Sequence, residues 1–161
     1  MKLIVGLGNP GEKYVNNRHN VGHMFIDFLN DKKITSVKAV KTDCFMNVSG
    51  AFVSRVLAKN GGDTQDLFIV HDDLDIPFGM FKVQRGRGPK VHNGITSVEE
   101  KLGTADFWRV RVGVEARLRQ DSGGPRPSGE EYVLADFTQD ERAMLNEVFP
   151  KIYSRITNGP L

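Results

Sequence analysis

Histidine, aspartate and asparagine side chains stand where short apolar segments of this sequence begin or end, and their types suit acid–base chemistry. His19 comes just before an amphipathic segment, and Asp72 follows an apolar run. A histidine that is neutral near pH 7 can act as a general base, and an aspartate bound to one ring nitrogen fixes its tautomer. The other nitrogen then takes a proton from water, so this pair predicts hydrolysis by activated water.

Three asparagines accompany this pair. Asn9 lies in a glycine-rich segment, and Asn47 and Asn93 stand at the expected starts of two helices. An amide can hold a peptide backbone or donate to a developing oxyanion, where one well-placed donor contributes about 3 kcal/mol. Taken singly, Asn47 and Asn93 are better explained as helix N-caps, and Asp72 as a solvated loop acid. Their gathering at one end of a sheet favours a site for acyl chemistry.

Neither a covalent nucleophile nor a metal site has a clear sequence signature. Ser49 precedes Gly50 but lacks the G-x-S-x-G pattern. His19 and His23 have the i, i+4 spacing of metal ligands, but the glutamate of H-E-x-x-H is missing and no third ligand stands nearby in sequence. We therefore expect water to attack an acyl bond without a covalent intermediate, a metal ion or another cofactor.

The glycine-rich segment 6–11 matches G-x-G-x-x-G after an apolar run. A dinucleotide site requires a helix that opens directly on the last glycine, whereas residues 12–18 intervene here. A Walker A loop is excluded because no Gly-Lys-Ser/Thr follows. We interpret the glycines as a tight turn that presents Asn9 at the carboxyl end of a strand. A dinucleotide-dependent enzyme is therefore a weak hypothesis.

Length and composition are those of an ordinary globular protein. The 161 residues suit one domain, 1–161, and no apolar run is long enough to cross a membrane. We find no targeting segment at the start of the sequence. Cys44 is the only cysteine, which rules out an internal disulfide and favours a reducing compartment. We expect a cytoplasmic monomer.

Charge is unevenly distributed, although the net charge is only +2. Segment 82–119 carries nine Lys and Arg residues against four acids, and segment 63–75 carries five aspartates and neither Lys nor Arg. Such polarity can offer one face to a polyanion. On charge alone, we favour solvated faces as the explanation of the pattern.

Apolar runs alternate with helical stripes, which predicts an α/β fold with a twisted mixed, mostly parallel sheet flanked by helices. Strands are expected at 3–7, 67–70, 80–84 and 107–114, and helical stripes at 21–29, 48–57, 95–102 and 144–152. Asn20 is a candidate cap, Thr138 and Glu141 form a candidate capping box, and Pro150 should kink or interrupt the last helix. Residues 116–131, rich in Gly, Pro and Arg, should form a mobile loop.

Six blocks of sequence, in order, resemble the bacterial-type peptidyl-tRNA hydrolase family. They are 6–14 with 18–22, 45–50, 71–75 with Pro77 and Gly79, 92–94, 109–113 and 132–137. Together they extend over nearly the whole chain, which is far more specific than any one block. The resemblance implies hydrolysis of the ester between a peptide and the 3′-terminal ribose of tRNA, which recycles tRNA from stalled translation.

The resemblance also implies a role for each matched residue. His19 would activate water, Asp72 would orient His19, and Asn9 and Asn93 would hold the peptide and the attacked carbonyl. The residues implied to bind the peptide end or to line the cleft towards the tRNA are Asn47, Met46, Tyr14 and His92.

A tRNA phosphate is implied to lie against Arg111. The companion lysine of the family falls on Gln84, so Lys82 or Arg85 would replace it.

The chain departs from the family pattern in two places. Only residues 31–44 fill the segment between the first helix and the Met-Asn motif, where the family has more residues and a strand pair, so we expect a shortened strand set. The loop before His92 reads Gly88-Pro89-Lys90-Val91 instead of being glycine-rich. These departures keep open a non-catalytic RNA-binding relative. The intact His19 and Asp72 argue against it, because RNA binding alone requires no histidine base.

Overall fold

A five-stranded sheet forms the centre of the protein, as seen in a computed structural model that describes residues 1–117 and 126–159. The strand order is β2-β1-β3-β5-β4, and only β4 runs antiparallel to its neighbour. The strands are β1 Leu3–Gly6, β2 Lys38–Lys41, β3 Leu67–Pro77, β4 Phe81–Arg85 and β5 Trp108–Glu115. The expected α/β class with a mixed, mostly parallel sheet is confirmed.

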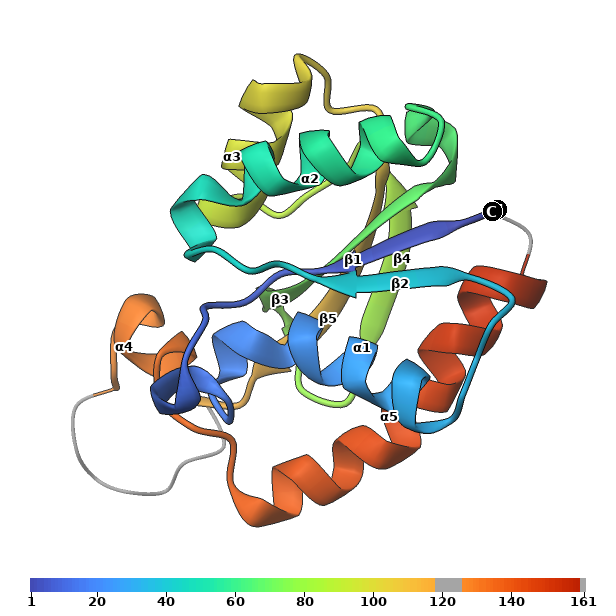
Figure 1. Cartoon of the computed structure of the whole chain (residues 1–161). Helices are drawn as coiled ribbons and strands as arrows, with labels where there is room; N and C mark the ends of the chain where they lie inside the picture. The colour runs from blue at the N-terminus through green and yellow to red at the C-terminus, as the bar shows by residue number, and fades with distance from the viewer. Residues whose placement is uncertain (118–125, 160–161) are drawn as a thin grey trace.

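Helices cover both faces of this sheet, which gives three layers (Figure 1). Helices α2 (Ser49–Lys59) and α3 (Asn93–Leu102) lie on one face, and α1 (Val21–Asp31) and α5 (Gln139–Asn158) lie on the other. The short helix α4 (Gly129–Val133) lies beside the segment that leads into α1. Three of the four 3₁₀ turns precede longer elements: η2 (Arg18–Asn20), η3 (Met46–Val48) and η4 (Thr64–Asp66), with η1 at Glu12–Tyr14.

Alternation along the buried strands produces two apolar cores. In β3, Phe68 and Val70 belong to the cluster with α1 and α5, and Leu67 and Ile69 belong to the cluster with α2 and α3. Successive strand residues point to opposite faces, so a strand covered on both sides is apolar throughout. This arrangement explains why the apolar run 67–70 was recognisable as a strand although apolar and polar residues do not alternate along it.

The order of the strands creates a crevice between β1 and β3. From β1 the chain crosses to β2 on one side and then returns to β3 on the other. At such a switch point the connections leave the carboxyl ends of the two strands in opposite directions, which opens a binding crevice. Asn9 follows β1 here, and Asp72 lies in β3 beyond its last pairing with β1 at Val70.

Two strand predictions were wrong. Strand β2 was not expected, because Lys38-Ala39-Val40-Lys41 is too short and polar to stand out, and it forms by pairing in parallel with β1. It lies in the short segment 31–44. Strand β3 does not end at Val70 but continues to Pro77, because β5 goes on pairing with it as far as Asp73 and again at Pro77.

Helix boundaries bring further corrections. Asn20 occupies the N-cap position of α1 but its side chain makes no capping bond. The Thr138–Glu141 capping box of α5 is confirmed, and Pro150 lies inside this helix without interrupting it. The expected loop 116–131 ends at Ser128, where α4 is capped, and residues 118–125 of that loop lie outside the described part of the chain.

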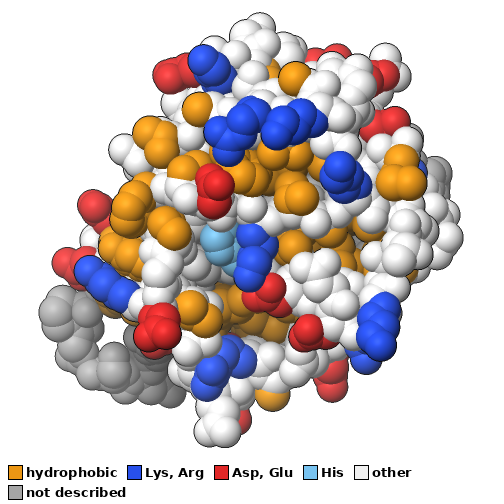
Figure 2. All heavy atoms as spheres, viewed as in Figure 1, with side chains coloured by type: hydrophobic (Ala, Val, Ile, Leu, Met, Phe, Trp, Pro, Cys, Tyr) orange, Lys and Arg blue, Asp and Glu red, His pale blue; other side chains and the backbone are white. Residues whose placement is uncertain are grey.

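Many of the basic side chains of segment 82–119 are neutralised locally. Four of its described arginines form ion pairs: Arg85 with Asp106, Arg109 with Glu99, Arg111 with Asp73 and Arg117 with Glu115. Figure 2 shows the face over β2, α1 and α5, where side chains of both signs are interspersed. The excess of Lys and Arg over acidic residues in this segment therefore overstates its free positive charge.

Among residues 1–117 and 126–159, no helix is both long and apolar enough to cross a membrane.

Candidate active site

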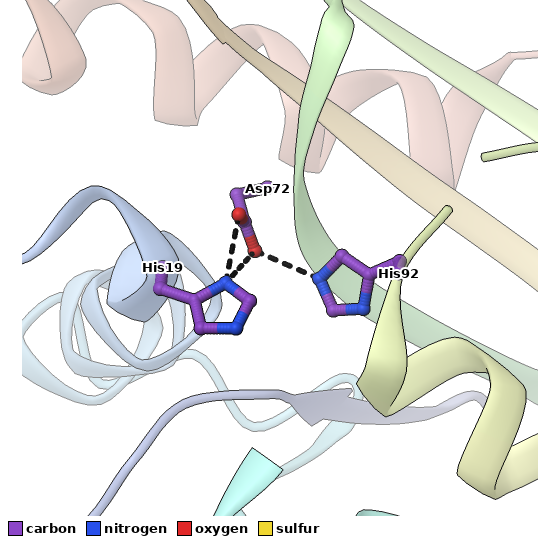
Figure 3. A group of neighbouring side chains, drawn as sticks. All are labelled: His19, Asp72 and His92. Carbon is purple, nitrogen blue, oxygen red and sulfur yellow. Dashed lines mark hydrogen bonds and ion pairs between the residues drawn. The ribbon is translucent and has the colours of Figure 1, made fainter. Parts of the chain in front are cut away.

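His19 and Asp72 meet at the crevice between β1 and β3. The Nδ1 atom of His19 lies 2.8 Å from Oδ2 and 2.9 Å from Oδ1 of Asp72 (Figure 3). Burial lowers the pKa of His19, but the charge and hydrogen bond of Asp72 together raise it by more, so this pKa is raised above its ordinary value. Burial alone would raise the pKa of Asp72, and the two flanking histidines hold it well below its ordinary value. Asp72 is therefore a carboxylate that accepts from His19, whose Nε2 is left to act as a base.

A second histidine approaches the same carboxylate from α3. The Nε2 atom of His92 lies 2.8 Å from Oδ1 of Asp72, so Asp72 lies between two imidazole rings (Figure 3). His92 is also the N-cap of α3, because its Nδ1 accepts from the backbone N–H groups of Gly94 and Ile95. The alternative explanation of Asn93 as the cap of this helix was wrong, because His92 is the cap. The Asp-His pair expected from sequence is part of a three-residue relay.

His71 lies behind the relay and is completely buried. Its Nδ1 donates to the backbone carbonyl of Asp72 at 2.8 Å, and its Nε2 has no partner among the described residues. Burial lowers the pKa of His71 to about 3, helped by the neighbouring His92. A neutral ring here supports the backbone of Asp72 without adding charge beside it.

Asn9 is held in one orientation by bonds from two other segments. Its Oδ1 accepts from the backbone N–H of Met46 at 2.8 Å, so its Nδ2 is the group left to donate. Asn20 accepts from the backbone N–H of Asn9 and donates to its carbonyl, both at 2.9 Å. Sequence reasoning assigned Asn20 to helix capping, and no local pattern pointed to this clamp.

These groups line a cleft of about 620 Å³. Asn47 and Asn93 are exposed on its walls, so both amides are free for a ligand. Neither caps a helix, because α2 starts after Val48 and the cap of α3 is His92. Tyr14 does not line the cleft but packs edge-on against Phe45, which does. The lining residues are Asn9, His19, Phe45, Met46, Asn47, Asp72, Leu74, Val91, His92, Asn93, Gly129, Glu130, Val133 and Leu134.

No serine, threonine, cysteine or lysine occurs among these lining residues. Ser49 is fully buried beneath the cleft, and its hydroxyl donates to the carbonyl of Met46 at 2.8 Å. A side-chain nucleophile of the usual types is therefore missing from the described walls. The attacking group that suits this site is a water molecule on Nε2 of His19.

The donor atoms of His19, Asp72 and His92 lie within 4.8 Å of one another, close enough to be considered as metal ligands. Ligands of a tetrahedral zinc at about 2.1 Å would lie roughly 3.4 Å apart. The observed separations of 2.8 Å are instead those of hydrogen bonds. His23 does not join this group, since its Nε2 lies 2.9 Å from Oγ1 of Thr42. The geometry favours a hydrogen-bonded His-Asp-His group.

The candidate tRNA contacts lie on β4 and β5, beyond the cleft. Arg111 is only 12% exposed, and it donates to Asp73 through Nε and to Gln84 through Nη1, each at 2.8 Å. Lys82 pairs with Arg111 in the sheet, so the two side chains share a face, and Lys82 is exposed. Arg85 lies on the opposite face and is bound to Asp106.

Fold and site together are those of an enzyme of the hydrolase class: a histidine hydrogen-bonded to a buried aspartate lies beside amide side chains at the switch point of a three-layer α/β sheet.

Comparisons with known proteins agree with this class and narrow it. The family model described as Peptidyl-tRNA hydrolase matches residues 3–43 and 31–158. The peptidyl-tRNA hydrolase of Geobacter metallireducens is 39% identical over 98% of this chain and 90% of its own length. That of Pseudothermotoga lettingae is 36% identical over 94% of this chain and 86% of its own. The chain belongs to the peptidyl-tRNA hydrolase family.

A solved structure supports the same conclusion. The crystal structure of peptidyl-tRNA hydrolase from Acinetobacter baumannii superimposes with a TM-score of 0.79 at 26% identity, covering 97% of this chain and 88% of that one. The family resemblance inferred from six sequence blocks is thereby confirmed.

Proposed function

We propose that this chain, as one domain over residues 1–161, hydrolyses the ester that joins a peptide to the 3′-terminal ribose of tRNA. One observation carries the proposal: His19 is bound through Nδ1 to the buried carboxylate of Asp72, in a cleft whose described walls hold no serine, threonine, cysteine or lysine. Family membership supports peptidyl-tRNA as the substrate.

The reaction follows from the roles of these groups. Nε2 of His19 takes a proton from water while the water oxygen attacks the ester carbonyl. Asp72 stabilises the imidazolium that forms and keeps the ring in one tautomer. The C–O bond to the ribose then breaks, and the proton on His19 passes to the departing ribose oxygen. The products are a peptide with a free carboxylate and a tRNA with a free terminal hydroxyl.

The carbonyl oxygen gains negative charge in this step. Nδ2 of Asn9 is a donor with a fixed orientation, because Oδ1 is already bound to Met46. Asn93 adds a second amide on the α3 side of the cleft, and Asn47 a third on the η3 side. We assign Asn9 and Asn93 to the carbonyl and Asn47 to the peptide backbone, with Met46 and Phe45 against the peptide and Tyr14 supporting Phe45.

The non-catalytic RNA-binding alternative is less well supported. A protein that only bound RNA would gain nothing from a buried carboxylate shared by two imidazole rings. Burying such polar groups costs free energy that nothing in simple binding requires.

A direct assay tests the proposed function. We expect the protein to release the N-acetylated amino acid from an N-acetylaminoacyl-tRNA, at the same rate with and without a chelator, since His19 and Asp72 supply the chemistry. The rate should fall as the pH drops through the pKa of His19, because an imidazolium takes no proton from water. Tight tRNA binding without release would support the RNA-binding alternative, and loss of activity with chelator would point to a metal ion.

The tRNA phosphate site makes a separate prediction. We propose that Lys82 and the Nη2 atom of Arg111 contact a tRNA phosphate. Lys82→Ala should weaken tRNA binding and lower the slope of log Kd against log salt by about 0.9, because one phosphate contact and its released counterion are lost. Binding at several salt concentrations measures this slope.

Arg85→Ala provides the matched control, since it also removes one charge from β4, but on the opposite face. Its salt slope should match that of the wild type. Equal effects of Lys82→Ala and Arg85→Ala would mean that tRNA binding depends on the overall charge of the protein and not on a contact with this face of the sheet.

A further inference from the structure

Both ring nitrogens of His92 are occupied by the protein itself. Nδ1 lies 3.1 Å from the backbone N of Gly94 and 3.2 Å from that of Ile95, and Nε2 lies 2.8 Å from Oδ1 of Asp72. The side chain is only 4% exposed. A tRNA in the cleft would find almost no free surface on this ring and no free hydrogen-bonding group.

The start of α3 determines the tautomer of His92. A nitrogen that accepts from two N–H groups presents its lone pair to them and carries no hydrogen. These two N–H groups belong to the first turn of the helix, where the backbone has unpaired donors and the positive end of the helix dipole. The hydrogen of the neutral ring therefore sits on Nε2, the ring nitrogen that is joined to Asp72 by a dashed line in Figure 3.

We infer that His92 is a positioning residue that acts on His19 through their shared carboxylate, and that it does not contact the tRNA. Its first task is to hold Asp72 in place by a bond anchored in the start of α3. Its second is to weaken the hold of Asp72 on a proton at His19. This inference rests on the proposed function of the site.

The second task follows from the sharing of one carboxylate by two donors. Oδ1 of Asp72 lies 2.9 Å from Nδ1 of His19 and 2.8 Å from Nε2 of His92. A hydrogen bond stabilises the negative charge of a carboxylate, so each donor lowers the stabilisation available to the other. With His92 in place, the imidazolium of His19 is stabilised less than by an unshared carboxylate, and its proton passes more readily to the leaving ribose.

Other titratable or charged groups face the relay from the surrounding elements. His71 of β3 packs with its ring centre 4.9 Å from that of His92, and Arg111 of β5 acts on His71. Glu130 of α4 lies on the wall of the same cleft. None of these side chains makes a hydrogen bond to the carboxylate of Asp72 among the described residues, whereas His19 and His92 both do.

Two substitutions test the contacts of the two ring nitrogens of His92 separately. His92→Asn keeps an acceptor at the δ position, so it can still cap α3, but it removes the donor to Asp72. His92→Gln keeps a donor at the ε position and removes the cap. We would measure kcat and KM on N-acetylaminoacyl-tRNA across pH for both variants, with their melting temperatures.

His92→Asn should melt close to the wild type, keep its KM, and lose about tenfold in kcat as His19 is oriented less well. The acid limb of its pH profile should move to higher pH, because Asp72 then stabilises the imidazolium of His19 more strongly. His92→Gln should keep the wild-type position of this limb and melt at a lower temperature. A raised KM in both variants, with an unmoved acid limb, would overturn the inference and place His92 against the substrate.

A measurement on the unmodified protein covers the case in which a variant does not fold. The nitrogen-15 chemical shifts of His92 should show hydrogen on Nε2 and none on Nδ1, and the opposite tautomer would overturn the inference. Inactivity of the wild type in the assay would instead count against the proposed function, so the two failures are distinguishable.

Discussion

Replacing His19 with asparagine should lower kcat by roughly 10²–10⁴-fold while KM changes little. The Nδ2 atom of asparagine takes the place of Nδ1 and can still donate to Asp72, which lies 2.8 Å from His19 in the wild type. Nothing then stands at the Nε2 position to take the proton from water. Initial rates on N-acetylaminoacyl-tRNA measure kcat and KM separately, and tRNA binding should remain.

His23→Asn is the matched control. His23 is also partly buried near the glycine-rich segment, but its Nε2 meets the hydroxyl of Thr42 and not the relay. Burial, assisted by Lys41, lowers its pKa to about 4, so it is neutral at the pH of the assay. This variant should keep most of its activity. Retained turnover in His19→Asn would remove His19 from the mechanism.

Asp72→Asn should have the second large effect, a loss of about 10³–10⁴-fold in kcat. An amide of the same shape offers one acceptor oxygen where the carboxylate offers two, and the wild-type carboxylate meets His19 and His92 together. One ring must then face an N–H group, and His19 loses the charge that stabilises its imidazolium.

The pH profile of this variant gives an independent check. Burial lowers the pKa of His19, and the charge and hydrogen bond of Asp72 raise it. Removing the raising contributions leaves the lowering one, so the acid limb of activity should move to lower pH while the plateau falls. Asp75→Asn, which changes an exposed carboxylate of the same strand, should alter neither the position of the acid limb nor the height of the plateau. An unmoved limb in Asp72→Asn would mean that another group sets the pKa of His19.

Periodicity predicted the elements that are buried on one clear face or on both. The helical stripe beginning at Val21 became α1, and the apolar run 67–70 became the central part of β3. Strand β2 escaped notice because an edge strand of four residues takes its stability from pairing with β1, which local sequence does not record. The extension of β3 to Pro77 likewise depends on a partner strand nearly 40 residues further along.

Residue types predicted which side chains would meet, but not how they would bond. His19 and Asp72 were expected together, and they lie in hydrogen-bond contact. The cap of α3 is His92, whereas the sequence offered Asn93 as the alternative, because asparagine is the commoner capping residue and both positions suit a helix start. The pairing of Arg111 with Asp73 joins residues 38 positions apart, so no local pattern indicates that this arginine is largely occupied.

The relay also crosses between the two apolar cores. His19 arrives from the turn that leads into α1, His92 from the start of α3, and these helices pack on opposite faces of the sheet. Asp72 lies on the central strand between them. Neither layer carries a complete catalytic apparatus, so partial unfolding that loosens either one would silence turnover while leaving the other intact. Activity therefore reports whether both helical layers are packed on the sheet in the same molecule.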